Sequence, residues 1–484
     1  MASKWGFIGA AYADDSPNVA AQRCVNLYPE TVQVGGEKNV ISLKSSPGLR
    51  TFGTLPTSPV KGQFSVDAHT FAVGGTNLYQ MLPNGTSLSR GVMATNHNPC
   101  TFATNGDGGN QLLTSSGGNA YVLDFTSNTF SQAHFTSGLT DYVPSDFVGF
   151  VDGFGLTLDV VNNKFYVSAP EDFTYWDATQ VRKRSSNADR WSSMIVNHSE
   201  VWLFGSQTTD VLRDTGASPM PFEPIVGTSI NQGILAPHSA AVWNNGVIWL
   251  GANASGAGRV WFASAYQPQE VSTVALNQQI AGYATVSDAV GYVEVWKGHE
   301  FYILNFPTQG KTWVLDASTS LWHERGWWNT TTGQFDGYRG QSQCYAFGQQ
   351  LVGDGTTGTI YALDDTVYTD AGGTPLVRLR QCPHVSSEQR WMFHQMLQID
   401  AEVGLGLNSG QGSDPQLMLQ WSDDGGHSWG NEHWLPLGPQ GQYRVRALIR
   451  RLGRSRDRVY RVVVSDPIPL RFVDAYLTVE GGTS

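Results

Sequence analysis

Residues 200–214 read EVWLFGSQTTDVLRD, which is two runs of β-branched, aromatic and aliphatic residues joined by a polar turn. Such residues favour a pleated, half-buried surface, and Gly205 with the Ser, Gln and Thr after it supplies the turn. Each run is too short for a helix and lacks the 3.6-residue apolar period, so the stretch predicts a β-hairpin. The rest of the chain has the same character, which predicts an all-β fold.

Hairpins of this kind recur along the chain at a regular spacing. In each, a strand ends in Gly or a polar residue, and a second strand with a central aromatic follows a short turn. The repeating units begin near residues 60, 99, 146, 190, 237, 287 and 333. A spacing of about 40–50 residues is typical of four-stranded propeller blades. We therefore predict a β-propeller of about seven blades, with six possible; a series of β-sandwiches is the alternative.

Two segments flank the predicted propeller, which spans residues 56–372. The stretch DAGGTP at 370–375 has the composition of a linker, and alternating strands such as 471–479 follow it. They predict a C-terminal β-sandwich over residues 373–484. Residues 1–55 are polar and punctuated by Pro and Gly, so we expect an extended N-terminal arm that wraps the body or a neighbouring molecule.

Composition narrows the possible functions. The 484 residues carry 30 Lys and Arg against 41 Asp and Glu, a net charge of −11. This acidic balance excludes a protein whose main task is to coat nucleic acid through its phosphates. No run approaches about 18 apolar residues, so no membrane-spanning helix is predicted. The four Cys lie far apart, which favours reduced thiols in a protein folded in a cytoplasm.

The strongest electrostatic feature is residues 444–461, which we call the Arg segment. It holds eight Arg and one acid, a net of +7, so the rest of the chain carries −18. Guanidinium groups suit bidentate pairing with carboxylate or phosphate. The segment therefore docks on an acidic protein partner, touches nucleic acid, or forms the solvated face of a two-stranded ribbon. Its basic residues are Arg444, Arg446, Arg450, Arg451, Arg454, Arg456, Arg458 and Arg461.

Residues 422–429 read SDDGGHSW and match the Asp-box pattern S-x-D-x-G-x-x-W. In such a hairpin the Asp satisfies turn amides, a Gly takes a positive φ and the Trp packs on the turn. The box is similar to those of sialidases, which would suggest glycan hydrolysis. Sialidases usually repeat the box, whereas here it occurs once and outside the propeller. We therefore interpret Ser422, Asp424, Gly426 and Trp429 as a structural turn.

No group of residues in the sequence predicts catalysis, a cofactor or a metal. Residues 426–430 read GHSWG, which has the form G-x-S-x-G, but a nucleophile elbow needs a helix after it and NEHWLP is not helical. The His residues form no HExxH motif and no cluster with Cys at zinc spacing. We therefore predict that the protein is not an enzyme.

Several stretches together resemble a known family. RCVNLYPE at 23–30 and SSPGLR at 45–50 are similar to the opening of the packaged-DNA stabilisation proteins of short-tailed bacteriophages, the P22-type tail hub or tail accessory factor. The C-terminal order of a Ser/Thr-Asp-Gly hairpin, RRLGR at 450–454 and a closing strand pair is also similar. VWLFGS at 201–206 matches the hub pattern of a strand that ends in Phe-Gly-Ser.

The resemblance implies a structural component of the virion that is made in the host cytoplasm. Members of the family form a ring of six below the portal and its adaptor ring, extend the DNA channel and help to retain the packaged genome. They also hold tail fibres or spikes and a central needle. Double-stranded DNA would pass without sequence-specific binding, since an acidic body repels it. The candidate contacts to subunits or adaptor are Asn26, Leu27, Tyr28, Pro29, Glu30, Pro47, Gly48, Arg444, Arg446, Arg450, Arg451, Arg454, Arg456 and Arg458.

A carbohydrate-binding or glycan-hydrolysing propeller of a receptor-binding tail protein is the alternative function. It requires an aromatic-lined cleft with carboxylates at the separation found in glycosidases. The 16 Trp are compatible with such a cleft, although most fall at strand positions expected in the core. An unrelated propeller scaffold that is absent from phage particles is a third possibility.

Overall fold

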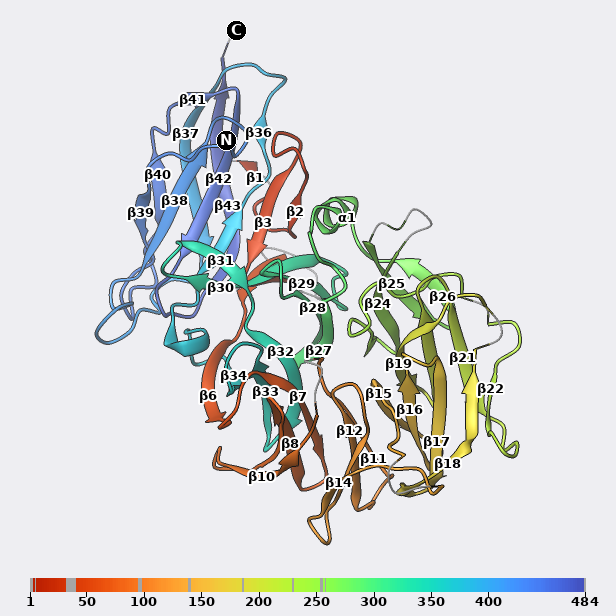
Figure 1. Ribbon diagram of the computed structural model, residues 1–484. Helices are drawn as coiled ribbons and strands as arrows, with labels where there is room; N and C mark the ends of the chain where they lie inside the picture. Colours follow the sequence, from red (N-terminus) through yellow and green to blue (C-terminus); the bar gives the residue numbers. More distant parts are fainter. Residues whose placement is uncertain are drawn as a thin grey trace.

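The computed structural model describes residues 3–4, 6–31, 41–94, 98–137, 141–184, 187–228, 230–252, 256 and 258–482. Strands dominate this part of the chain, and its helical elements are α1 (Val274–Ala281) and a single 3₁₀ turn, η1 (Ala371–Gly373). The strands form two bodies, a fan of small sheets and a taller body beside it (Figure 1). The prediction of an all-β protein is confirmed.

The fan is a propeller whose sheets each have four antiparallel strands. Seven such sheets follow one another within the described residues. The first three blades are β7 (Val60–Val66), β8 (His69–Gly74), β9 (Asn77–Met81) and β10 (Ser87–Val92); β11 (Thr101–Thr104), β12 (Gln111–Ser115), β13 (Tyr121–Asp124) and β14 (Phe130–Gln132); and β15 (Phe147–Val151), β16 (Phe154–Asp159), β17 (Lys164–Pro170) and β18 (Asp172–Lys183).

The remaining four blades continue the same order around the axis. They are β19 (Trp191–Asn197), β20 (Glu200–Gly205), β21 (Thr209–Asp214) and β22 (Phe222–Pro224); β23 (Ala241–Trp243), β24 (Gly246–Ala252), β25 (Gly258–Ser264) and β26 (Gln267–Glu270); β27 (Val290–Trp296), β28 (His299–Phe306), β29 (Lys311–Asp316) and β30 (Trp322–Asn329), with β31 (Gln334–Gly337) paired to β30; and β32 (Gly340–Ala346), β33 (Gln349–Asp354), β34 (Thr359–Asp364) and β6 (Gly48–Thr54).

The ring of blades is closed. The first strand of each blade contacts the first strand of the next, and β32 of the seventh blade contacts β7 of the first. The outermost strand of the seventh blade, β6, comes from the N-terminal segment and pairs antiparallel with β34, so that Leu49 lies opposite Leu363. Arg50 Nε donates to Asp364 at 2.9 Å across the same pair, 314 positions apart in the chain. A propeller with about seven blades was the prediction.

The taller body is a β-sandwich, as predicted. Two sheets face each other, and buried residues such as Leu397 and Leu477 from one and Leu419 and Val462 from the other share one apolar core. One sheet contains β1 (Ser3–Lys4), β4 (Leu27–Thr31), β5 (Ile41–Ser45), β37 (Met392–Ala401), β40 (Ala447–Arg450), β41 (Arg454–Ser455) and β43 (Arg471–Gly481). The other contains β2 (Tyr12–Ala13), β3 (Ala21–Val25), β35 (Arg378–Gln381), β36 (Val385–Ser386), β38 (Gln416–Ser422), β39 (His433–Pro436) and β42 (Asp457–Val464).

The N-terminal segment contributes strands to both bodies. β3 pairs with β35 of the sandwich and, through Val25 and Glu324, with β30 of the sixth blade, so a single twelve-stranded sheet runs from propeller to sandwich. Phe7 is fully buried, and its ring meets that of Phe472 edge to face at 5.5 Å. Residues 32–40 of the predicted arm lie outside the described residues. The domain boundaries drawn from the sequence stay predictions.

The stretch with linker composition packs on the propeller. Asp370 is 2% exposed, and its Oδ1 accepts a hydrogen bond from the Ala371 amide at 2.7 Å. Trp327 Nε1 donates to the Ala371 carbonyl and to Thr374 Oγ1, at 3.2 and 3.0 Å. Burial raises the pKa of Asp370 to about 6, because a desolvated carboxylate is less stable than the neutral acid.

This buried carboxyl predicts a pH-dependent stability. Its pKa rises from 3.8 in the unfolded chain to about 6 in the fold, so ionisation opposes folding. The contribution of Asp370 to the free energy of unfolding is most favourable below pH 4. It falls as the pH rises through 6, by about 3 kcal/mol in all. Asp370→Asn keeps the acceptor for Ala371 without the charge. We expect its urea midpoint to exceed that of the wild type at pH 7.5 and to match it at pH 4; a difference independent of pH would contradict this.

Candidate interaction surfaces

The N-terminal motif lies inside the chain, where the propeller meets the sandwich. Asn26 is 2% exposed and has a left-handed φ of 55°, a conformation that Asn tolerates better than most residues. Its Nδ2 donates to the Gly326 and Val377 carbonyls, both at 2.8 Å, and its Oδ1 accepts from the Gly326 amide at 3.0 Å. Gly326 belongs to the propeller and Val377 leads into the sandwich, so one side chain ties the N-terminal segment to both bodies.

The residues after Asn26 pack into the same junction. Leu27, Tyr28 and Pro29 are buried. The Tyr28 ring meets the rings of His299 and Phe301 edge to face, with centroids 5.1 and 5.3 Å apart. Burial raises the pKa of the Tyr28 hydroxyl to about 12, so it stays neutral. These side chains stabilise the attachment of β4 to the sixth blade.

The end of the motif and the start of β6 complete the junction. Glu30 is partly exposed and pairs with Lys44 at 2.5 Å, whereas Pro47 and Gly48 are buried. A Cβ atom at Gly48 would lie 2.0 Å from the Val367 carbonyl oxygen, so this position has no room for a side chain. The structure thus brings the seven motif residues together around the domain junction. Their contact with a partner stays a prediction.

The Arg segment divides into internal and exposed parts. Arg458 is 1% exposed: its Nε and Nη2 donate to the two carboxylate oxygens of Asp423, at 2.5 and 2.8 Å, and its Nη1 donates to the Leu452 carbonyl. The guanidinium of Arg461 lies 3.9 Å from the centre of the Trp429 ring. Both side chains hold strands of the sandwich together, and Arg458 has no free surface to offer to a partner.

The other six Arg are exposed and lie at the two ends of β40. Two precede the strand, and four are at its end or in the turn and strand that follow. Among the latter, Arg454 and Arg456 lie over the ring of Trp391, at 4.6 and 4.9 Å from its centre. Trp391 is not among the residues predicted from the sequence, where its signal is a Trp that stands between Arg390 and the first residue of β37. The exposed set is Arg444, Arg446, Arg450, Arg451, Arg454 and Arg456.

The Asp-box residues form the turn that follows β38. Ser422 Oγ donates to Asp424 at 2.6 Å and accepts from the Gly426 amide at 2.8 Å. The Ser428 amide donates to the Asp424 carboxylate at 2.9 Å. Hydrogen bonds from the Ser422 and Ser428 hydroxyls hold the pKa of Asp424 well below its usual range. Gly426 has a φ of 101°, which favours glycine. Each of these polar groups is used within the turn.

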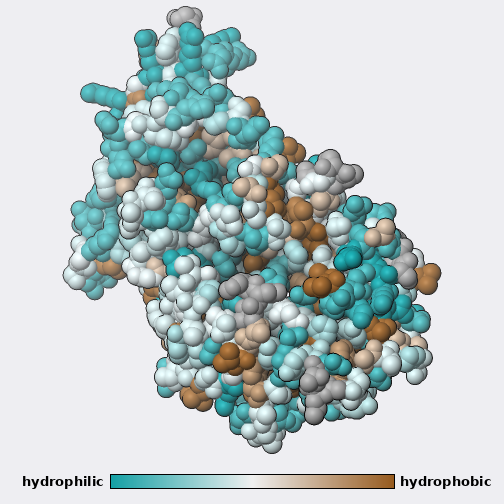
Figure 2. Space-filling model, viewed as in Figure 1, coloured by the Kyte–Doolittle hydropathy of each residue, from teal (hydrophilic) through white to brown (hydrophobic). Residues whose placement is uncertain are grey.

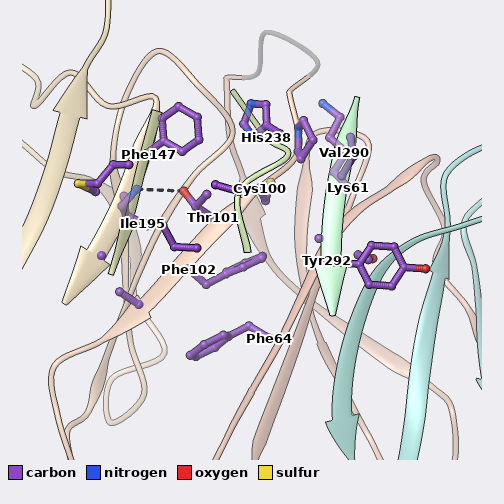
Figure 3. Close-up of a pocket in the computed structure, with 18 of the residues that line it drawn as sticks. Lys61, Phe64, Cys100, Thr101, Phe102, Phe147, Ile195, His238, Val290 and Tyr292 are labelled. Carbon is purple, nitrogen blue, oxygen red and sulfur yellow. Dashed lines mark hydrogen bonds between the residues drawn. The ribbon is translucent and has the colours of Figure 1, made fainter. Parts of the chain in front are cut away.

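A cavity of about 520 Å³ lies between the innermost strands of the propeller, and residues from six of these strands and from the segment before β23 line it; Figure 3 shows several of them. Phe147, His238 and Tyr292 contribute rings, and Thr101 Oγ1 accepts from the Val148 amide at 3.0 Å. Burial lowers the pKa of His238 to about 4, so its imidazole is neutral at pH 7. Among the residues that the structure describes, the lining includes Lys61 but no Asp or Glu, whereas glycoside hydrolysis uses a pair of carboxylates.

Within the part of the chain that the structure describes, no group of three or more His, Cys, Asp and Glu residues is placed to hold a metal ion. None of its helices has both the length and the apolar character needed to cross a bilayer.

A closed propeller joined to a β-sandwich by a shared sheet defines a two-domain β scaffold, and both domains match known families. Residues 7–368 match the family described as "Bacteriophage P22 Gp10, beta-propeller", and residues 378–480 match "Bacteriophage P22 Gp10, beta-sandwich". The chain therefore belongs to the bacteriophage P22 Gp10 family, which confirms the resemblance drawn from the sequence. Members of this family are structural proteins of the phage particle.

Other comparisons add only likeness of fold. No curated protein matches the chain. Streptogramin B lyase aligns with 66% of this chain and 98% of its own, at 8% identity and a TM-score of 0.43. The N-terminal domain of Nup159 aligns with 70% of this chain and 98% of its own, at 12% identity and a TM-score of 0.38. Exo-beta-1,3-galactanase from Phanerochaete chrysosporium aligns with 90% of this chain and 100% of its own, at 10% identity and a TM-score of 0.29. TM-scores this low carry no argument about function.

The position of Asn26 predicts a large loss of stability on truncation. Asn26→Ala leaves the Gly326 amide and two buried carbonyls without a partner, at about 1–3 kcal/mol for each group. We expect a loss of at least about 3 kcal/mol in the free energy of unfolding, measured by urea denaturation. Asn128→Ala is the control, because Asn128 has the same φ of 55° and is exposed. Equal losses in the two variants would show that backbone strain, not the hydrogen bonds, matters.

Proposed function

We propose that the protein is a structural tail hub of a short-tailed phage, made in the host cytoplasm and built into the virion. Six copies form a ring below the portal and its adaptor. The ring extends the DNA channel, helps to retain the packaged genome and holds tail fibres or spikes and a central needle. The observation that carries this proposal is the match of both domains, residues 7–368 and 378–480, to the P22 Gp10 family.

The size of the axial cavity supports a channel formed between copies. About 520 Å³ holds on the order of 17 water molecules at about 30 Å³ each. A B-DNA duplex is wider than its major groove, which alone is about 12 Å across. A cavity of about 520 Å³ has no room for such a duplex along the propeller axis. A DNA conduit built from this chain therefore needs several copies around a common axis.

The charge of the chain supports passage of DNA without tight binding. A net charge of −11 repels the phosphate backbone, so a duplex moves along the ring and does not adhere to it. The axial cavity does not favour the alternative of a glycan-hydrolysing propeller, because the described residues that line it include no Asp or Glu.

Native mass spectrometry of the purified chain with a cognate portal–adaptor complex tests the hub proposal. We expect six copies to add to the complex, because a ring that closes below the adaptor has a fixed number of subunits. The portal without its adaptor is the control and is expected to bind no ring. A chain that stays unbound while the adaptor itself is bound to the portal would overturn the proposal.

A further inference from the structure

Four exposed Arg gather at the end of the sandwich that lies away from the propeller. We call Arg450, Arg451, Arg454 and Arg456, with the exposed ring of Phe393 and the half-buried ring of Trp391, the Arg tip. Figure 1 places β41 and the start of β37 at this end, and Figure 2 shows hydrophilic side chains standing out from it. Within the described residues, none of the four Arg forms an ion pair.

The backbone holds the Arg tip in a fixed arrangement. Phe393 lies opposite Arg454 on the paired strands β37 and β41. Ser455 is buried and hydrogen bonded to His394 Nε2 at 2.8 Å, so the side chains on either side of it, Arg454 and Arg456, both face outward. Both guanidinium groups share the face or edge of one ring, Trp391. Two like charges held this close repel each other, and an opposing anion would relieve that repulsion.

The acids near the Arg tip are engaged elsewhere. Glu388 pairs with Arg390 at 3.0 Å. Asp457 pairs with His384 at 2.8 Å. Glu480 accepts a hydrogen bond from Gln395 at 3.1 Å. Within the described residues the four guanidinium groups therefore have no carboxylate partner, which leaves their donors for a carboxylate from outside the chain.

An acidic surface occurs on the second and third blades. Bridges from Phe135 to Trp176 and from His134 to Tyr142 bring residues 134–137 and 141–142 beside residues 168–179. None of these residues is Lys or Arg. These residues include four acids and two half-exposed rings, which we name the acidic edge. Its members are Asp141, Glu171, Asp172, Asp177, Tyr142 and Tyr175.

The Arg tip and the acidic edge cannot meet within one chain. Figure 1 places β41 at one extreme of the molecule and β14 and β18 at the other. Residues 378–482 hold twelve Arg, no Lys and eleven acids, a net of +1, whereas residues 1–377 carry −12. The exposed Arg of one copy are thus attracted to the acidic remainder of another.

We propose that the Arg tip of one copy docks head to tail on the acidic edge of a second copy of this chain. The inference rests on the proposed hub function and names the surfaces that join its ring. A contact between two different patches of identical chains closes into a ring when its rotation fits. Arg, Trp and Tyr are the residue types enriched at interface hot spots, and both patches consist of them and of charges of opposite sign.

A protein partner fits the Arg tip better than DNA. Guanidinium groups over an indole ring, with Phe393 beside them, supply apolar contact area that a phosphate backbone does not use. The net charge of −11 also repels DNA from the molecule as a whole. DNA binding at the Arg tip is therefore an outcome that the test must separate from the proposal.

Charge reversal on each surface tests the contact. The tip variant is Arg454→Glu with Arg456→Glu, and the edge variant is Asp141→Arg with Glu171→Arg, whose side chains are exposed. We expect each variant alone to reduce the amount of six-copy complex on the portal–adaptor by about tenfold or more. Carrying all four substitutions in one chain restores the pairing with reversed signs, so six copies should return. An equal mixture of the two variants should also assemble, as three of each.

A matched control separates local contact from net charge. Arg190→Glu with Arg471→Glu makes the same change in charge at exposed side chains outside the Arg tip and the acidic edge, and we expect six copies to add as in the wild type. Loss of assembly in this control would overturn the proposal in favour of a net-charge effect. Circular dichroism and thermal unfolding show whether each variant folds, and rescue in the four-fold variant shows that the substitutions are tolerated.

The remaining outcomes are distinct. Full assembly of either single-surface variant overturns the head-to-tail contact and leaves the hub proposal intact. If the tip variant loses assembly and the four-fold variant does not restore it, the Arg tip contacts the adaptor. If the tip variant assembles normally but loses binding to a DNA duplex, the Arg tip contacts DNA. Both outcomes overturn the proposal. Failure of the wild-type chain to add to the portal–adaptor complex would overturn the hub function itself.

Discussion

The insertion of the N-terminal segment between the two domains is the constraint on which the rest of the structure depends. The Asn26 amide joins backbone groups that are 300 and 351 positions away in the chain, one on each domain. β3 continues the sheet of the sixth blade into the sandwich, and β6 completes the seventh blade. The same 34 or so residues therefore close the propeller and fix the sandwich to it. Neither domain is complete without them.

The blades could be predicted because their signals are local. A strand, a short turn and a second strand lie within about fifteen residues, and β20 with β21 shows this in Glu200–Asp214. The predicted units begin at or a few residues before the innermost strands, such as β7 at Val60 and β19 at Trp191. The closing strand could not be predicted in the same way. Gly48–Thr54 pairs with a strand more than 300 positions later, and no local pattern records a partner at that distance.

The candidate site could be predicted only in part, because burial is a property of the fold. The motif around Asn26 was expected to meet a partner, and the structure uses it within the domain junction. The Arg segment appears uniform in sequence, yet Arg458 is buried against Asp423 while Arg454 stands in solvent. What separates them is a change of sheet: residues two apart on one strand share a face, but Arg454 lies on β41, which pairs with β37, whereas Arg458 lies on β42 of the other sheet. The acidic edge could not be predicted from the sequence, because its acids come from two blades.

The Arg of the sandwich serve two purposes that only this side chain combines. Arg380 is fully buried, and its guanidinium donates to the carbonyls of Phe7 and Ala10, at 2.6 and 2.9 Å, and so holds the start of the chain. Arg378 likewise donates to the Ile468 carbonyl at 2.8 Å. A planar group with five donors can satisfy several carbonyls at fixed angles, which the single ammonium of Lys cannot. The absence of Lys from residues 378–482 therefore follows from internal bonding as much as from the exposed tip, where the same planarity lets guanidinium groups stack on Trp391. One residue type thus builds the interior of the sandwich and gives its outer end the charge that a second copy would recognise.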